Sequence, residues 1–165
     1  MIIGILSDTH GNVKRASQAI KAMKPHSPAH IIHCGDIGSE SVITELAAGC
    51  MNPQIPVTCV LGNVDVYNHE IVSSWPHVRI EGRFAQLELD GNKIAVVHGD
   101  DFLRLRGAIE RGQFDYVFTG HTHMRADELE GRTRVINPGA LQRTNEPGCA
   151  VLDLCTGKLT FLDVR

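Results

Sequence analysis

The sequence predicts an α/β fold of two packed mixed β-sheets flanked by helices. Three patterns support this prediction: the first half alternates short apolar runs with helical patterns, the middle carries a hairpin signal, and the tail reads as further strands. Each sheet of such a chain must bury an apolar face. A chain that begins βαβαβ and ends as a β meander therefore favours two stacked sheets with helices on the outer faces.

Five short apolar runs have the length and composition of buried strands. Each run stops at a residue whose side chain can bind a metal. The runs cover residues 2–7, 31–35, 57–62, 94–97 and 116–120, and they lead to Asp8, Asp36, Asn63, His98 and His121 in that order.

Three further segments have helical patterns, each with a capping residue in front. The side-chain oxygens of Asn12, Ser39 and Asp101 can accept hydrogen bonds from the first backbone N–H groups of a helix. The predicted helices span residues 13–23, 40–48 and 102–111.

The rest of the chain reads as one loop and several strands. Residues 84–89 lead through the turn Asp90-Gly91-Asn92 to the run at 94, which is a hairpin signal. Residues 66–78 have no regular pattern and are expected to form a loop beside any site. No repeat or linker divides the chain, so residues 1–165 are expected to form a single domain. The remaining predicted strands cover 134–136, 149–154 and 159–164.

The composition is that of an ordinary globular protein, with 42% apolar and 21% charged residues. A net charge of -3 argues against an extended nucleic-acid surface, because such surfaces carry a basic stripe. There is no long apolar stretch and no signal-peptide pattern, so we expect a cytoplasmic protein without membrane contact. The five cysteines lack Cys-x-x-Cys spacing and are expected to be reduced structural thiols.

The polar residues at the strand ends predict a metal site. Open α/β sheets bind ligands at the carboxyl ends of their strands, so these side chains should converge. Two ions about 3.5–4 Å apart would use seven mixed oxygen and imidazole ligands more naturally than one ion would. The candidate ligands of this dinuclear centre are Asp8, His10, Asp36, Asn63, His98, His121 and His123.

These residues belong to five short motifs whose order is informative. The motifs resemble those of the calcineurin-like metallophosphoesterases over residues 3 to about 164, and this resemblance implies an αββα sandwich. The short chain and the later Asn137-Pro138-Gly139 resemble the small bacterial and archaeal phosphodiesterases, whose eukaryotic relative is a retromer subunit. The motifs are Asp8-x-His10, Gly35-Asp36, Gly62-Asn63-Val64-Asp65, His98-Gly99 and Gly120-His121-Thr122-His123.

The resemblance implies how the ligands are shared between two divalent ions. Asp36 would bridge them, and Asp36, Asn63 and His98 would act closest to the reacting phosphate. Manganese is the expected metal, with iron, zinc or nickel as alternatives. One ion would be held by Asp8, His10, Asp36 and His123, and the other by Asp36, Asn63, His98 and His121.

The implied reaction is hydrolysis of a small phosphate ester by in-line attack of a hydroxide that bridges the two metals. Many members of the superfamily have a histidine after the motif asparagine, where this chain has Val64. Valine cannot protonate a leaving group, so a phosphodiester with a stable leaving anion is the expected substrate. A phosphomonoesterase or nucleotide phosphatase on the same metals is one alternative, and a non-catalytic protein-binding scaffold is another.

Several residues near the motifs keep two interpretations. Asp65 either ties down the Asn63 turn or has a purely structural role. Asp100 either orients a ligand or is a solvated loop acid or helix-entry residue. Arg143 either reaches a substrate phosphate or is a surface arginine. Exposed apolar residues in the 66–78 loop would be compatible with a homo-oligomer. Tyr67 and Trp75 in that loop either stack on a nucleoside or cover apolar surface, and the other five histidines, His26, His30, His33, His69 and His77, are expected to bind no metal.

Overall fold

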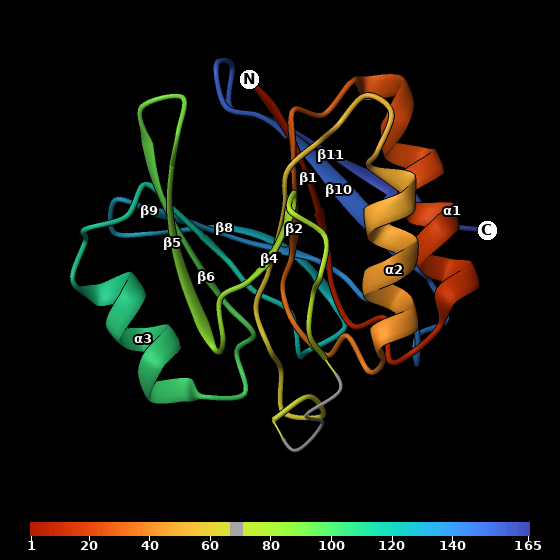
Figure 1. Ribbon diagram of the computed structural model, residues 1–165. Helices are drawn as coiled ribbons and strands as arrows, with labels where there is room; N and C mark the ends of the chain where they lie inside the picture. The colour runs from red at the N-terminus through yellow and green to blue at the C-terminus, as the bar shows by residue number, and fades with distance from the viewer. Residues whose placement is uncertain (67–70) are drawn as a thin grey trace.

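The computed structural model describes residues 1–66 and 71–165, which form two mixed β-sheets packed face to face between helices (Figure 1). The predicted fold class is therefore confirmed. Tyr67 and His69 lie outside the described residues, so their predicted roles stay untested. The elements are β1 (Ile2–Leu6), α1 (Val13–Met23), the 3₁₀ helix η1 (Lys24–His26), β2 (His30–His33), α2 (Glu40–Gly49), β3 (Val57–Cys59), β4 (Val78–Ile80), β5 (Phe84–Leu89), β6 (Asn92–Val97), α3 (Phe102–Glu110), β7 (Tyr116–Phe118), β8 (Arg125–Glu130), β9 (Thr133–Pro138), β10 (Gly148–Asp153) and β11 (Lys158–Asp163).

The first sheet has the order β11-β10-β1-β2-β3-β4. Strands β1 to β4 are parallel, and β10 and β11 join antiparallel at the β1 side. The second sheet has the order β5-β6-β7-β9-β8, in which β6, β7 and β9 are parallel and the two outer strands are antiparallel. Each sheet thus has a parallel centre, whose strands present their carboxyl ends at one edge.

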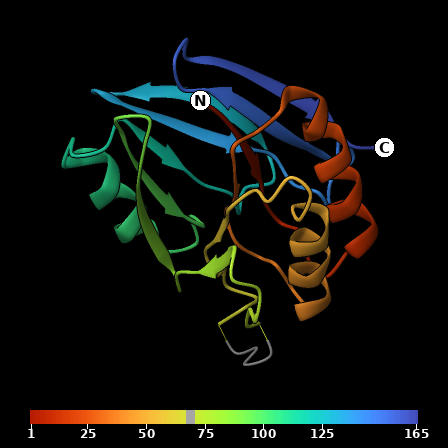
Figure 2. The same ribbon diagram turned by 45° about the horizontal axis from the view of Figure 1, so that its top comes forward.

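Three apolar cores separate the four layers. In the first core, Ile20 and Met23 of α1 and residues of α2 pack on one face of the first sheet. In the second core, Ile5 and Phe118 help fill the space between the two sheets. In the third, Ile109 of α3 packs on the outer face of the second sheet. Figures 1 and 2 show this arrangement, with α1 and α2 together on one side and α3 on the other. None of the helices in the described ranges has the length and apolar character needed to cross a membrane.

Alternation along β1 explains why this sheet is covered on both faces. Ile3 and Ile5 point to the core between the sheets, and Leu6 points to the helices. Gly4 faces the helices as well, and a methyl group there would lie only 2.5 Å from Met23 Sδ. A glycine is therefore required for α1 to pack this closely on the sheet.

The tail is not the β meander that the sequence predicts. Strand β9 pairs with β7 and β8 in the second sheet, whereas β10 crosses to the first sheet and pairs with β1. The sequence also gives no signal for β8, whose residues are mostly polar, or for the short edge strand β4. Four of the five strands that lead to candidate ligands end one to three residues earlier than predicted.

The predicted helices are correct to within one residue at their ends. Asn12 and Asp101 cap their helices as expected, accepting hydrogen bonds from the backbone N–H groups of Arg15 and Arg104. Ser39 occupies the N-cap position of α2, but its side chain makes no capping hydrogen bond. That part of the prediction is wrong.

Candidate metal centre

The candidate ligands lie in loops that leave the carboxyl ends of β1, β2, β3, β6 and β7. His98 directly follows β6, and the others follow after one to a few loop residues. Backbone hydrogen bonds join these loops, since Asp8 N donates to Gly35 O (3.0 Å) and Gly120 N donates to His98 O (2.9 Å). His121 N donates to Asp8 Oδ2 at 3.1 Å, so the loops of both sheets meet at one edge of the sandwich.

Asp8 is at the centre of the site and is completely buried. Its Oδ1 lies 3.2 Å from His123 Nε2, 3.8 Å from His10 Nε2 and 4.0 Å from His98 Nε2. This oxygen accepts no hydrogen bond from any residue that the structure describes. The other oxygen, Oδ2, accepts a hydrogen bond from His121 N at 3.1 Å, so the carboxylate is held with Oδ1 facing the histidines.

Asp36 lies between two histidines, and its two oxygens face different rings. Oδ2 is 3.7 Å from His10 Nε2, and Oδ1 is 3.3 Å from His98 Nε2. Val64 N donates to Oδ1 at 3.1 Å and fixes the orientation of the carboxylate. A carboxylate held in this way can share its oxygens between two neighbouring cations.

The structure brings five of the seven candidates into two overlapping groups. Asp8, His10 and His123 form one group, and Asp8, Asp36 and His98 form the other, with the potential ligand atoms of each group within 4.8 Å of one another. The His121 ring centroid is 5.2 Å from that of His98, at an interplanar angle of 74°. Asn63 is exposed beside the site, between Gly62 and Val64, and the backbone N–H of Val64 binds Asp36.

Five of the seven candidates have a left-handed backbone conformation that non-glycine residues seldom adopt. Their φ angles range from 44° to 67°. Such conformations cost free energy and persist only where the surrounding structure holds them. The chain turns at Asp8, Asp36 and His121 shortly after β1, β2 and β7, so no strand continues through these residues. The residues are Asp8, His10, Asp36, His121 and His123.

Backbone carbonyls orient two of the imidazole rings. His98 Nδ1 donates to Cys34 O at 2.8 Å, and His123 Nδ1 donates to Arg143 O at 3.2 Å. A ring that donates through Nδ1 presents the Nε2 lone pair on its other side. For both histidines that side faces Asp8, so these rings are arranged as metal ligands.

Burial and charge act in opposite directions on the ionisable groups of the site. Burial disfavours the charged form of His98, but the carboxylates of Asp36 and Asp8 outweigh it and raise the pKa of His98 above its ordinary value. Burial disfavours the ionised carboxylate of Asp36, but His98 and the Val64 N–H hold its pKa below the ordinary value. For His10, burial and the charge of Arg143 lower the pKa.

Two glycines allow the loops to approach the carboxylates. A Cβ at Gly62 would lie 2.1 Å from Asp36 Oδ1, and a Cβ at Gly120 would lie 2.7 Å from Asp8 Oδ2. Any other residue at these positions would displace a candidate ligand. The glycines of the sequence motifs therefore have a direct steric reason.

Asp65 ties down the Asn63 turn, as one interpretation of the sequence held. It is 1% exposed, and it accepts hydrogen bonds from the backbone N–H groups of Gly62 (2.9 Å), Ile37 (3.0 Å) and Gly38 (2.8 Å). These bonds connect the loop after β2, which carries Asp36, with the loop after β3. Asp65 is a positioning residue for both loops.

Two positioning residues were not assigned a role from the sequence. Asn137 donates through Nδ2 to Gly120 O (2.8 Å) and so supports the loop that carries His121 and His123. His33 accepts from Gly35 N at Nδ1 (3.2 Å), so its Nε2 carries the proton and donates to Thr9 Oγ1 (2.9 Å). Burial lowers the pKa of His33 to about 3 and keeps the ring neutral. The sequence signals were the place of Asn137 in the Asn137-Pro138-Gly139 motif and the position of His33 shortly before Gly35-Asp36.

Asp100 does not bond to a candidate ligand. Its Oδ2 accepts from Arg83 Nη2, and the pair joins the loop after β6 to the start of the hairpin. Asp100 therefore neither orients a ligand nor is a solvated loop acid, but it does stand at the helix entry, directly before the N-cap Asp101 of α3. Its role is to hold the loop that follows His98.

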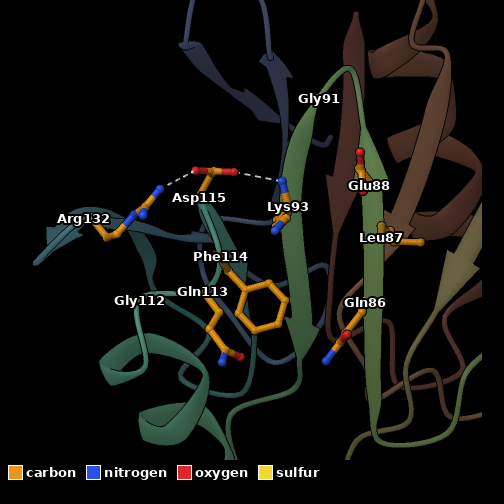
Figure 3. Close-up of a pocket in the computed structure, with 10 residues that line it drawn as sticks. All are labelled: Gln86, Leu87, Glu88, Gly91, Lys93, Gly112, Gln113, Phe114, Asp115 and Arg132. Carbon is orange, nitrogen blue, oxygen red and sulfur yellow. Dashed lines mark hydrogen bonds and ion pairs between the residues drawn. The ribbon is translucent and has the colours of Figure 1, made fainter.

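A hollow at the hairpin does not coincide with this centre. It has a volume of about 650 Å³ and lies beside the β5–β6 hairpin, where Asp115 accepts from Lys93 N and pairs with Arg132 (Figure 3). Lys93 and Asp115 are at the amino ends of the parallel strands β6 and β7, opposite the ends that carry His98 and His121. None of the seven candidate ligands lines this hollow.

The donor set at the strand ends fits divalent metal ions. The buried Asp8 Oδ1 and His98 Nε2 have no hydrogen-bond partner in the described parts of the chain. His10 Nε2 and His123 Nε2 lie 3.4 Å apart. Lone pairs crowded around unpartnered carboxylate oxygens are unfavourable unless a cation lies between them. Carboxylate and imidazole together suit borderline divalent metals.

The fold and this cluster of acidic and imidazole groups are those of a metal-dependent hydrolase of the αββα type. The chain belongs to the calcineurin-like phosphoesterase superfamily, whose domain model matches residues 1–157. This family implies divalent metal ions at the cluster. The resemblance stated from the sequence motifs is thus confirmed.

Curated relatives and solved structures agree with this assignment. A phosphodiesterase of Methanocaldococcus jannaschii is 32% identical over 158 residues, which cover 93% of each chain. A probable metallophosphoesterase of Methanothermobacter thermautotrophicus is 32% identical over 178 residues, covering all of this chain and 92% of the relative. The solved structure of an archaeal phosphodiesterase superposes with a TM-score of 0.87 at 30% identity and covers 99% of this chain and 100% of its own.

More distant structures share the fold alone. A phosphoesterase of E. coli has a TM-score of 0.69 at 17% identity, with full coverage of both chains. Vacuolar protein sorting 29 of Cryptosporidium parvum has a TM-score of 0.67 at 18% identity, with 98% of this chain and 95% of its own covered.

Proposed function

We propose that this protein is a metal-dependent phosphodiesterase whose centre holds two divalent ions. The position of Asp36 carries the proposal, since its Oδ2 faces His10 and its Oδ1 faces His98. One carboxylate between two sets of histidines is the arrangement that a bridging ligand requires. The proposed ligands of one ion are Asp8, His10, Asp36 and His123, and those of the other are Asp36, Asn63, His98 and His121.

Two bound ions would activate a water molecule for in-line attack and take up the negative charge of the phosphoryl oxygens. The residues of the chain set the geometry for this chemistry. Asp8 is held by His121 N, Asp36 by Val64 N, and the His98 ring by Cys34 O. Because these groups are oriented by the backbone, they need little rearrangement when ions and substrate bind. We expect manganese as the preferred metal.

Val64 favours a diester with a good leaving group. It is 36% exposed beside Asn63, and its side chain carries no proton to donate. A leaving group that departs as a stable anion needs no general acid, whereas an alkoxide does. The phosphodiesterase of M. jannaschii, at 32% identity, supports a diester substrate.

The proposal also covers the domain organisation, the cellular location and the substrate size of the enzyme. We propose that residues 1–165 act as one metallophosphoesterase domain in the cytoplasm, on a small phosphate ester rather than on extended nucleic acid. The net charge of -3 supports a small substrate. All five cysteines are free thiols, and four of them are buried, which suits a reducing compartment.

The test uses protein stripped of metal and then loaded with manganese. We expect hydrolysis of bis(4-nitrophenyl) phosphate, and we expect Asp36→Ala and His98→Ala to lower kcat by at least 10³-fold and to lose bound manganese. The controls are Asp163→Ala and His26→Ala, which remove the same side-chain types outside the centre. Full activity in the first two variants would refute the assigned centre.

Two further outcomes would redirect the assignment. Faster hydrolysis of 4-nitrophenyl phosphate than of the diester would identify a phosphomonoesterase on the same metals. Binding of manganese without hydrolysis of either ester would instead support the non-catalytic scaffold. The diester-to-monoester ratio of kcat/KM therefore separates the alternatives.

A further inference from the structure

Arg143 lies in the loop between β9 and β10, close to the candidate metal centre. Its backbone has a φ of 58°, and its carbonyl oxygen accepts the hydrogen bond from His123 Nδ1 at 3.2 Å. The side chain of Arg143 is exposed. The backbone of this residue thus orients a candidate ligand while its side chain is accessible to solvent.

The loop is fixed to the strand end that carries Asp8. Leu141 N donates to Ser7 O at 3.2 Å, and Gln142 N donates to Asp8 O at 3.1 Å. Gln142 Oε1 also accepts a hydrogen bond from Asn12 Nδ2 at 2.9 Å. Arg143 follows directly after Leu141 and Gln142, so its Cα is held in place next to the centre.

The positive charge of Arg143 is carried by a residue whose backbone carbonyl already binds the candidate ligand His123. Arg125 and Arg134, on neighbouring strands, each have a carboxylate partner at 2.7 Å. Within residues 1–66 and 71–165, Arg143 forms no ion pair. Its charge is therefore available to an incoming anion.

We propose that Arg143 is a substrate-binding residue whose guanidinium holds a non-bridging oxygen of the substrate phosphate beside His10 and His123. This inference deepens the proposed function and rests on it. A guanidinium presents a planar fork of N–H donors that matches phosphate oxygens and stays charged at all relevant pH values. The phosphate charge is already present in the bound ground state, so the contact should mainly affect KM.

The variants are chosen to change the guanidinium alone. Arg143→Gln keeps a Cβ, so the left-handed conformation is equally strained, and it keeps the carbonyl that binds His123. Arg143→Lys keeps the charge but loses the fork. The matched control is Arg111→Gln at the end of α3, which removes an exposed arginine at the opposite end of β7.

The experiment measures both turnover and binding with manganese-loaded protein. For Arg143→Gln we expect about a tenfold rise in KM for bis(4-nitrophenyl) phosphate, with kcat within about threefold of wild type. We expect a similar loss of affinity for inorganic phosphate in calorimetric titration. Arg143→Lys should fall between wild type and Arg143→Gln, and Arg111→Gln should match wild type.

The outcomes separate this inference from the proposed function. Unchanged KM and phosphate affinity in Arg143→Gln would overturn the inference while leaving the phosphodiesterase assignment intact. Loss of bound manganese in Arg143→Gln would also overturn it, because the side chain would then act through the metal centre. If wild type binds phosphate but hydrolyses no ester, the function fails and the phosphate titration alone decides the role of Arg143. If wild type neither hydrolyses an ester nor binds phosphate, both fail.

Discussion

Asp65→Asn is predicted to destabilise the protein and to weaken metal binding, although Asp65 is not itself a candidate ligand. Asp65 accepts three backbone N–H groups, two at Oδ2 and one at Oδ1. These N–H groups belong to Ile37, Gly38 and Gly62, which flank Asp36 and precede Asn63. An asparagine has the same shape but has only one acceptor oxygen.

The magnitude follows from those three contacts. If the amide oxygen of the variant takes the Oδ2 position, its NH₂ group faces the N–H of Gly38, and one backbone donor loses its partner. An unsatisfied buried donor costs about 1–3 kcal/mol, and the two remaining bonds lose the strength that an ionised acceptor gives. We therefore expect Asp65→Asn to lower the free energy of unfolding by about 2–4 kcal/mol. For a domain of this size, that corresponds to a fall in Tm of roughly 5–15 °C.

The assay is urea unfolding of the metal-free protein, followed by titration with manganese. We expect manganese affinity to fall by about 10- to 100-fold, as when other groups that support metal ligands are removed. Asp101→Asn is the matched control, since it removes the same charge from a residue that accepts one N–H at a helix N-cap. Asparagine caps a helix as well as aspartate does, so this change should stay within about 0.5 kcal/mol. If Asp65→Asn behaved like Asp101→Asn in both measurements, the reasoning about the two loops would be wrong.

Three further predictions concern other parts of the molecule. Burial lowers the pKa of His30 from 6.5 to about 4, so the unfolded chain takes up a proton at higher pH than the folded protein does. The free energy of unfolding should therefore fall by about 3 kcal/mol as the pH drops from about 6.5 to 4, measured by urea unfolding. His30→Gln should remove most of this pH dependence. Gly4→Ala should destabilise the protein by about 1–3 kcal/mol, because its methyl group would meet Met23. Gly107→Ala, on the open face of α3, should stabilise the protein by about 0.5–1 kcal/mol. Chemical unfolding measures both changes. Manganese at 100 times its Kd should stabilise the protein by about 2.7 kcal/mol for each ion bound, and a chelator should reverse the rise in Tm. No change in Tm would argue against a metal site.

The sequence predicts the location of the site because the rule for strand ends is general. Any polar residue that follows a buried parallel strand lies at the same edge of the sheet, so Asp8, Asp36 and His98 could be grouped before their contacts were known. The strand boundaries were less accurate. The turns at Asp8, Asp36 and His121 adopt left-handed backbone conformations, which apolar periodicity does not reveal.

The tail was predicted less well because its pairing is long-range. Strand β10 pairs with β1 at the other end of the chain, and no local pattern distinguishes this from pairing with β9. Strand β8 was missed since an edge strand can be polar on both faces, and its charged residues discourage pairing with another chain. The supporting roles of Asn137 and His33 also depend on tertiary contacts. Their hydrogen bonds join segments that are brought together only in the folded protein.

The left-handed ligands explain why so much hydrogen bonding surrounds this centre. A non-glycine residue in this conformation costs about 1–2 kcal/mol, and five of them together cost on the order of 5–10 kcal/mol. That is comparable to the whole net stability of an ordinary domain. The bonds His10 N to Asp36 O (2.9 Å) and His121 N to Asp8 Oδ2 (3.1 Å), together with those of Asp65, stabilise these turns. These hydrogen bonds therefore contribute to the orientation of the ligands in addition to any bond to a metal ion.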